Sequence, residues 1–579
     1  MRTTSSRSSN AWTPTARTAP DSARDSDVTE QALEAGESST APAGARAAGI
    51  VLLTLASGQF LMTLDSSVMN VSIAQVAHDV GTTVTGIQTA ITLYTLVMAT
   101  MMITGGKIGS LIGRRKAFAI GCVIYGAGSF TTSIAPNLGI LMFGWSFLEG
   151  IGAALIMPAI VALVASNFPP EGRPRAYGLV AAAGAIAVAV GPLIGGLTTT
   201  YASWRYVFAG EVVIVIGILA LTRKILDTPP EARFKLDYVG IVLSAIGLGL
   251  AVFGVLRSSV YGWVQPKPGG PSWWGLSPTI WLIFIGLFVL RVFFGWERRM
   301  VARGREPLVR IAMLKNSQLD GGLVMFFFQF MIQMGLFFVI PLFLSVALGL
   351  SAAATGVRLL PLSITLLLGA VGIPKVFPKA RPRLVVRAGL LALLAGIVSL
   401  IASLNAGAGP EIVTVPLLFA GLGVGALASQ LGAVTVSAVP DNVSGEVGGL
   451  QNTMTNLGAS LGTALAGSVL IGALTASFLS GIASNPDIPK NVSQEASVKL
   501  AAGIPFVSNQ QLEDGLKQAG VPQQEAQAVI DTNETARIYG LRVSLAILGI
   551  VTLIALFFTH MVPTTPVGVS QKAEARAGP

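Results

Sequence analysis

The chain has 579 residues, of which 52% are hydrophobic and only 11% are charged. Soluble globular domains carry about 25% charged residues, and a mean hydropathy of +0.69 is typical of a membrane protein rather than of a soluble enzyme with one anchor. The net charge of +10 at pH 7 lies mostly in short loops between apolar runs. It therefore indicates membrane topology and not nucleic-acid binding.

The sequence also lacks the residue patterns of common cofactor and metal sites. Cys122 is the only cysteine, and the two histidines, His78 and His560, lie far apart, which excludes a thiolate cluster and gives no metal-binding pattern. Lys107 follows a glycine but precedes Ile108, so there is no phosphate-binding loop for ATP. We expect no cofactor, no metal and no enzymatic activity.

Residues 1–45 are rich in Ser, Thr, Ala, Pro and Arg and show no helical periodicity, which predicts a disordered tail. Fourteen apolar runs follow, each near the length of a membrane-spanning helix. The predicted spans are 47–73, 86–108, 117–136, 138–165, 176–199, 206–224, 237–256, 278–297, 319–346, 355–375, 384–404, 411–436, 446–477 and 538–561.

The basic residues of the short loops predict the orientation of these spans. Loops after the even-numbered runs hold about 21 Lys and Arg residues, whereas short loops on the other side hold about three. Both termini are therefore expected in the cytoplasm. Residues 478–537 form the one long loop, which is expected outside, with short amphipathic helices at 509–519 and 523–536; Ser508 is a candidate cap for the first of them.

An internal repeat indicates two related halves. In the fifth run Gly191 and Gly196 have the same spacing as Gly462 and Gly467 in the thirteenth run, as duplication of a six-helix unit in a secondary carrier produces. We predict a cytoplasmic tail, an N-terminal six-helix half, two inserted helices, a C-terminal six-helix half and a second cytoplasmic tail, over residues 1–45, 46–225, 226–316, 317–562 and 563–579.

Three carboxyl groups fall inside predicted spans. A charged side chain at that depth costs a few kcal/mol, so Asp65, Glu149 and Glu211 should face a cavity or a partner, where they could bind and release protons. Hydrogen bonds to neighbouring hydroxyls are the alternative for Asp65. For Glu211 the alternative is a salt bridge to Arg205.

Polar side chains and small residues supply further candidates. Pairs four residues apart share a helix face and could line a substrate cavity or bond neighbouring helices: Gln88 and Thr92, Gln329 and Gln333, Asn452 and Asn456. Two glycine-containing stretches could change the contacts between helices during transport or serve only for packing and topology: Gly106, Gly113, Arg114 and Arg115 in the loop after the second run, and Gly184, Gly191, Pro192, Gly195 and Gly196 in the fifth run.

Taken together, the chain resembles the major facilitator superfamily, and within it the fourteen-helix drug:proton antiporter family. The resemblance covers residues 47–561 and rests on motifs in the first, fourth and fifth runs and in several loops. These motifs are Leu64–Val71, Gly106–Arg115, Phe147–Ala154, Gly184–Gly196, Trp204–Phe208, Gly349–Pro361 and Gly421–Gly425. The resemblance implies that Asp65 takes part in proton coupling.

The chain departs from that family's pattern at charged positions. Ser110-Leu111 replaces the usual Asp-Arg, and Ser146 replaces an arginine implicated in proton transfer. Glu149 and Glu211 stand where the family usually has glutamine and asparagine. Either proton coupling involves Asp65, Glu149 and Glu211 together, or the acidic groups suit cationic ligands.

These observations predict an all-α polytopic protein of the plasma membrane, a monomer with 14 transmembrane helices in a 6 + 2 + 6 arrangement. Its expected function is to export small amphipathic or lipophilic compounds, with cations favoured, in exchange for protons. The alternatives are an exporter of a lipid, a siderophore or another metabolite, an uptake carrier, and a membrane sensor on the same fold that does not transport.

Overall fold

The computed structural model describes residues 41–169, 173–226, 236–267, 269–405, 407–439, 444–486, 488 and 506–565. It divides into two units, residues 1–49 and 50–579. Of the first unit the structure describes residues 41–49, which are helical; the second unit holds everything discussed below. Residues 1–40 and 566–579, which make up most of the two predicted tails, lie outside the described residues.

Every predicted apolar run falls on a helix. Among the described residues, thirteen segments are long and apolar enough to cross a membrane. The third run lies on α4, a less apolar helix whose first turn is Arg114-Arg115-Lys116. The helices in order are α2 (Ala41–Asp79), α3 (Val84–Ile112), α4 (Arg114–Ser133), α5 (Leu138–Leu141) continued by η1 (Met142–Glu149) and α6 (Gly150–Asn167), α7 (Arg173–Tyr201), α8 (Arg205–Thr222), α9 (Tyr238–Tyr261), α10 (Pro278–Ala302), α11 (Ser317–Leu342) continued by η3 (Phe343–Ala347), α12 (Ala352–Leu367) continued by η4 (Leu368–Gly372) and α13 (Ile373–Val376), α14 (Pro382–Ser403), α15 (Thr414–Val436), α16 (Ser444–Ser484), α18 (Asn509–Gln518) and α19 (Gln523–Phe558).

Two large hydrophobic cores hold the bundle together. The first gathers buried side chains from residues 51–225. The second gathers buried side chains from residues 325–562, together with Val71 of α2 and Val188 of α7. These two valines therefore lie where the helices of the first group meet those of the second.

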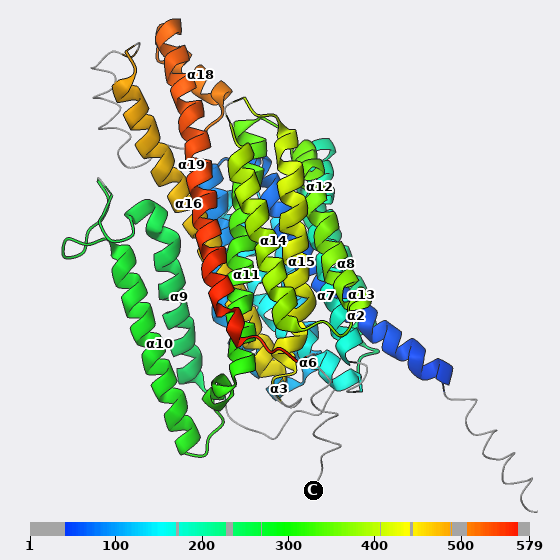
Figure 1. The fold of residues 1–579 in the computed structure, drawn as a ribbon. Helices are drawn as coiled ribbons and strands as arrows, with labels where there is room; N and C mark the ends of the chain where they lie inside the picture. The colour runs from blue at the N-terminus through cyan, green and yellow to red at the C-terminus, as the bar shows by residue number, and fades with distance from the viewer. Residues whose placement is uncertain are drawn as a thin grey trace, which may run out of the picture. The chain divides into compact units, whose positions relative to one another are not determined.

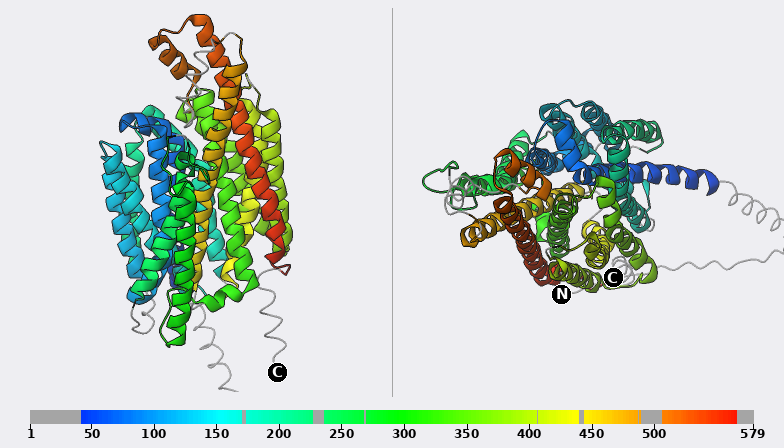
Figure 2. Two further views of the ribbon diagram at one scale, coloured as in Figure 1. Left: turned by 90° about the vertical axis from the view of Figure 1, so that its left-hand side faces the viewer. Right: turned by 90° about the horizontal axis from the view of Figure 1, so that it is seen from above.

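The helices α9 and α10 form an antiparallel pair at the side of the bundle (Figures 1 and 2). Gly286 allows them to approach closely, because a Cβ there would lie 2.5 Å from the backbone nitrogen of Ala251. The pair reaches the bundle through α9, which packs on α3 and α16. On α10, Phe284 and Phe288 are exposed, as expected of a face toward lipid.

Beyond the bundle, α16 and α19 continue as a pair that carries α18 (Figure 1). The predicted short helix at 509–519 is confirmed, and Ser508 caps it by accepting a hydrogen bond from the Gln511 backbone nitrogen at 3.1 Å. The predicted break between residues 536 and 538 is wrong, because α19 is continuous. Asp531, Glu534 and Arg537 end the apolar run there without ending the helix.

At the opposite end of the bundle lie residues 106–116 and 298–310, which we call the basic end. Gly113 separates α3 from α4 with a φ of +99°, a conformation that favours glycine. Lys107 lies 3.4 Å from the Glu306 carboxylate and 3.5 Å from the Glu446 carboxylate. Arg310 also pairs with both acids. These ion pairs connect α3 to the start of α16 and to the segment after α10.

Candidate functional site: a buried carboxyl triad

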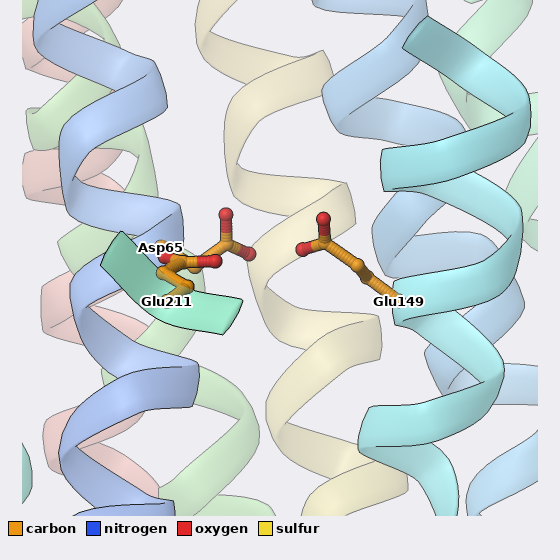
Figure 3. A group of neighbouring side chains, drawn as sticks. All are labelled: Asp65, Glu149 and Glu211. Atoms are coloured by element: carbon orange, nitrogen blue, oxygen red, sulfur yellow. The ribbon is translucent and has the colours of Figure 1, made fainter. Parts of the chain in front are cut away.

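The structure brings Asp65, Glu149 and Glu211 together inside the bundle (Figure 3). One carboxylate oxygen from each residue lies within 4.8 Å of the corresponding oxygens of the other two. The side chains come from α2, the end of η1 and α8, and the exposed fraction of each residue is at most 1%. We refer to these three residues as the carboxyl triad.

Each carboxyl group of the triad has one oxygen that is hydrogen-bonded. The indole Nε1 of Trp145 donates to Asp65 Oδ1 at 2.8 Å. The helix α4 supplies the other partners, which are the Tyr125 hydroxyl at 3.2 Å and the Ser129 hydroxyl at 3.1 Å from Glu211 Oε2, and the Thr132 hydroxyl at 3.2 Å from Glu149 Oε1.

The second oxygen of each carboxyl group is buried and has no hydrogen-bond partner among the described residues. These oxygens are Asp65 Oδ2, Glu149 Oε2 and Glu211 Oε1. The hydroxyl of Tyr94 is also buried and lies close enough to Asp65 to interact with its carboxyl group. The Tyr94 ring stacks on Trp145 with 5.2 Å between ring centroids. Buried polar atoms are normally paired, so these carboxylate oxygens are suited to share a proton or to hold a water molecule or an ion.

Local backbone features bring the triad together. Glu149 ends η1, a π-helical segment within the fourth predicted span, and such bulges are frequent at functional sites. Gly128 on α4 lets η1 approach closely, because a Cβ at this position would lie 2.6 Å from Glu149 Cγ and 2.7 Å from the Gly144 carbonyl oxygen.

None of the ion pairs found among the described residues involves the triad. The predicted alternative of a salt bridge between Glu211 and Arg205 is wrong. Arg205 instead lies 3.7 Å from the Asp79 carboxylate and donates a hydrogen bond to the Ala135 carbonyl at 2.8 Å, because it lies at the start of α8, more than one turn before Glu211.

The triad can therefore hold protons or a cation. Like charges in close contact disfavour ionisation of all three carboxyl groups, and an uncompensated buried charge is costly. Protons shared among the free oxygens would reduce the charge. The same oxygens are also ligands that hard cations such as Ca²⁺ or Mg²⁺ prefer.

A small cavity lies on another side of α2. Its volume is about 20 Å³, roughly enough for one water molecule. The lining is mostly apolar and contains no charged side chain among the described residues. The lining residues are Ser67, Asn70, Val71, Val188, Pro192, Phe337, Pro341, Leu359, Leu362 and Ser363.

A comparison with known protein families shows which family the chain belongs to. The model of the family described as Major Facilitator Superfamily matches residues 55–463. The chain belongs to the Major Facilitator Superfamily. Among curated relatives, it is 29% identical to the puromycin resistance protein pur8 of Streptomyces alboniger over 442 residues, which cover 75% of this chain and 84% of that protein. It is 28% identical to a probable actinorhodin transporter of Streptomyces coelicolor, with 74% and 72% covered.

Solved structures agree on the fold. A bacterial homologue of the human lysosomal transporter Spinster aligns with a TM-score of 0.54 at 15% identity, covering 89% of this chain and 97% of that one. A peptide transporter in complex with sulfate aligns with a TM-score of 0.53 at 15% identity, covering 89% and 96%. The protein is therefore a multi-pass transporter of the plasma membrane with the superfamily's helical fold, and not an enzyme.

The glycine-containing stretch of the fifth run, Gly184–Gly196, lies between α2 and α12. A Cβ at Gly191 would lie 2.5 Å from the Ser67 Cβ, and one at Gly195 would lie 2.9 Å from the Val68 Cα. On the other side, Gly196 contacts the Ala352 carbonyl, where a Cβ would lie at 2.5 Å, and Gly356 of α12 contacts the Pro192 carbonyl. Gly184 lies against Gln59 of α2.

The predicted loop stretch Gly106–Arg115 makes several contacts at the basic end. Gly106 lies in the last turns of α3. Arg114 donates a hydrogen bond to the Ala162 carbonyl and Arg115 one to the Ile225 carbonyl, both at 3.2 Å. Ser110 bonds the Lys107 carbonyl within its own helix.

None of the six residues that the sequence predicted for a substrate cavity is among the described residues that line the small cavity on α2. The side chain of Gln88 lies outside the described part, and Thr92 is half-buried. Gln329, Gln333, Asn452 and Asn456 are all buried. The two asparagines bond carbonyls of their own helix, α16, so their role in the substrate path stays a prediction.

Sequence reasoning missed the hydrogen-bond partners of the triad. Trp145 could have been found, because it lies one helical turn before Glu149. Ser146 binds the Ala90 carbonyl at 2.8 Å where the family resemblance implies an arginine. The hydroxyls of Tyr125, Ser129 and Thr132 gave no signal, because aromatic and hydroxyl residues are common in membrane helices.

Proposed function

We propose that this protein exports small amphipathic or lipophilic compounds, such as antibiotics, in exchange for protons, and that the carboxyl triad is its proton site. The observation that carries this proposal is the burial of three carboxyl groups with their free oxygens close together. The names of the relatives, a puromycin resistance protein and a probable actinorhodin transporter, support export of such compounds.

The triad has the properties that a proton-coupling site requires. Its hydrogen-bond donors come from α4 and η1, so a change in protonation would change the contacts of Asp65 with Trp145 and of Glu211 with Ser129. Because α2 also lines the cavity through Ser67 and Asn70, a movement of this helix could couple proton binding to the substrate site.

We base the proposed membrane topology on the excess of Lys and Arg in the loops on one side of the membrane, because such loops stay in the cytoplasm. With α4 counted as the third span, the chain has fourteen transmembrane helices, and the basic end and both termini face the cytoplasm. The extension formed by α16, α18 and α19 then lies outside. We propose a monomer in which helices of residues 46–225 and 317–562 form the two transporting halves, and α9 and α10 pack beside them.

Contacts between the two halves support alternating access. At the basic end Lys107 reaches Glu446 of α16. Toward the other end Thr200 of α7 accepts a hydrogen bond from the Ala353 backbone nitrogen of α12 at 3.2 Å. Both sets of contacts cross between the halves, and alternating access requires each set to open in turn.

The experiment uses purified protein in liposomes with an imposed pH gradient and an internal pH dye. Ethidium, puromycin and the uncharged 2-naphthol are added in turn to the wild type, to Asp65→Asn, and to Glu513→Gln, a matched acid-to-amide control on exposed α18. We expect substrate-dependent proton flux in the wild type and in Glu513→Gln and a loss of at least tenfold in Asp65→Asn. Unchanged flux in Asp65→Asn would sink the proposed proton site, and folded wild type without flux would favour a lipid substrate or a sensor.

A further inference from the structure

Two buried glutamines on α11, Gln329 and Gln333, precede the residues of the same helix that line the cavity. At about 100° per residue, residues four apart differ by about 40°, so Gln333 points in nearly the same direction as Phe337 and Gln329 lies about 80° from it. Phe337 and Pro341 line the cavity. The exposed fractions of Gln329 and Gln333 are 3% and 5%.

The amide oxygens of these glutamines lack donors. Gln329 Oε1 and Gln333 Oε1 are buried and have no hydrogen-bond partner among the described residues. An unpaired buried acceptor costs about 1–3 kcal/mol. A ligand that brings hydrogen-bond donors to these glutamines would recover that cost.

The cavity and the carboxyl triad lie on opposite sides of α2. At about 100° per residue, Ser67, Asn70 and Val71 point roughly 140° to 240° around the helix from Asp65. Ser67, Asn70 and Val71 line the cavity, whereas Asp65 faces Trp145. A ligand in the cavity is thus separated from the triad by the helix itself.

We propose that the two glutamines of α11, with Asn70 of α2 and Ser363 of α12 across the cavity, bind an uncharged compound that has an aromatic or otherwise apolar body and hydrogen-bond donors. This inference rests on the proposed transport function and names its substrate class. It replaces the expectation of a cationic substrate, which assumed that the acidic residues line the substrate site. A charged ligand would enter a site without a counter-charge, which is costly.

Binding is measured on the full-length protein in lipid nanodiscs with four probes that share a naphthalene ring. These are 2-naphthol, which is neutral and donates a hydrogen bond, 2-methoxynaphthalene, which lacks the donor, the trimethyl-(2-naphthyl)ammonium cation, and 2-naphthalenesulfonate. The sulfonate tests whether Arg358, which precedes the cavity-lining Leu359, recruits an anion. We expect 2-naphthol to bind at least tenfold more tightly than either charged probe.

Variants locate the site. Gln333→Leu should weaken 2-naphthol binding about tenfold and leave 2-methoxynaphthalene binding unchanged, because only the acceptor is lost. Gln430→Leu on α15, whose amide bonds the neighbouring Ser429, is the matched control and should bind all probes as the wild type does. A thermal unfolding midpoint equal to that of the wild type shows that Gln333→Leu is folded. If the midpoint is lower, Gln333→Met, which is close to glutamine in length and lacks the acceptor, takes its place and should likewise weaken the binding of 2-naphthol but not that of 2-methoxynaphthalene.

Tighter binding of the ammonium or the sulfonate, or equal weakening of all probes in Gln333→Leu, would overturn the substrate class. These results are independent of the proton site. A protein whose proton flux depends on Asp65 but which prefers the cation retains the proposed function and loses this inference. If 2-naphthol binds as expected but no substrate produces proton flux, this inference about the binding site is retained and the proposed function is lost.

Discussion

Trp145 donates its indole hydrogen to Asp65 across 2.8 Å between two separate spans. This hydrogen bond holds the carboxyl group of α2 against η1, the same segment that ends in Glu149. Asp65 is thus linked to Glu149 through η1. Trp145 is held in place there, because its ring stacks on Tyr94 and its exposed fraction is only 1%.

Replacing Trp145 with Phe should impair proton coupling more than stability. The phenyl ring keeps the stack on Tyr94 but removes the donor to Asp65, and a hydrogen bond to a charged group contributes about 1.5–3 kcal/mol. We expect substrate-dependent proton flux to fall about tenfold or more. Trp204→Phe is a matched control, because Trp204 is also buried and donates to a carboxylate, Asp79, at 3.0 Å; equal losses in the two variants would assign the effect to packing.

Gly128→Ala should destabilise the protein. The added methyl group would meet Glu149 and the Gly144 carbonyl at less than 3 Å, and overpacking of this kind costs about 1–3 kcal/mol. Thermal unfolding in detergent should show a lower midpoint. Gly217→Ala on α8, where a Cβ has no neighbour within 4 Å, should leave the midpoint unchanged or raise it. The same midpoint in both variants would contradict the close contact of α4 with η1.

Lys107→Met should loosen the basic end. The change removes the ion pairs of this side chain with Glu306 and Glu446, one of which connects the two halves. We expect Asn70→Cys, placed at the cavity in a Cys122→Ser background, to react several-fold faster with an impermeant maleimide added from the basic end. Lys517→Met, which breaks a pair with Glu513 on exposed α18, should not alter the rate; no acceleration in Lys107→Met would show that other contacts close this end.

Ser508→Ala should destabilise α18 alone. The substitution removes the cap on the Gln511 backbone nitrogen, which is worth about 1 kcal/mol. Hydrogen exchange should become faster in residues 509–518, with α19 residues beyond 540 unaffected. Faster exchange throughout α19 would mean that the extension unfolds together with the bundle.

Much of the fold could be predicted from the sequence, because a membrane helix needs a long apolar run and satisfies its own backbone. Each of these runs falls on a helix of the structure, and Ser508 marked the start of α18. The same signal failed at residues 536–538, where Arg537 ends the apolar run but its guanidinium bonds the Val507 carbonyl at 2.9 Å and the helix continues.

The site could be predicted only in part. The burial of Asp65, Glu149 and Glu211 followed from their place in apolar runs. Their convergence did not, because it depends on the packing of α2, η1 and α8 around α4, which leaves no local pattern.

The most direct test of the account is infrared spectroscopy of the purified protein in lipid, which detects the carbonyl vibration of protonated carboxyl groups. The wild type near neutral pH is compared with the triple variant Asp65→Asn, Glu149→Gln and Glu211→Gln. We predict a band from buried protonated carboxyl groups that is absent from the triple variant and weakens when substrate binds. No band difference between the two proteins, or a band in the wild type that disappears on addition of Na⁺ or Ca²⁺ without substrate, would contradict a proton site and indicate a cation site.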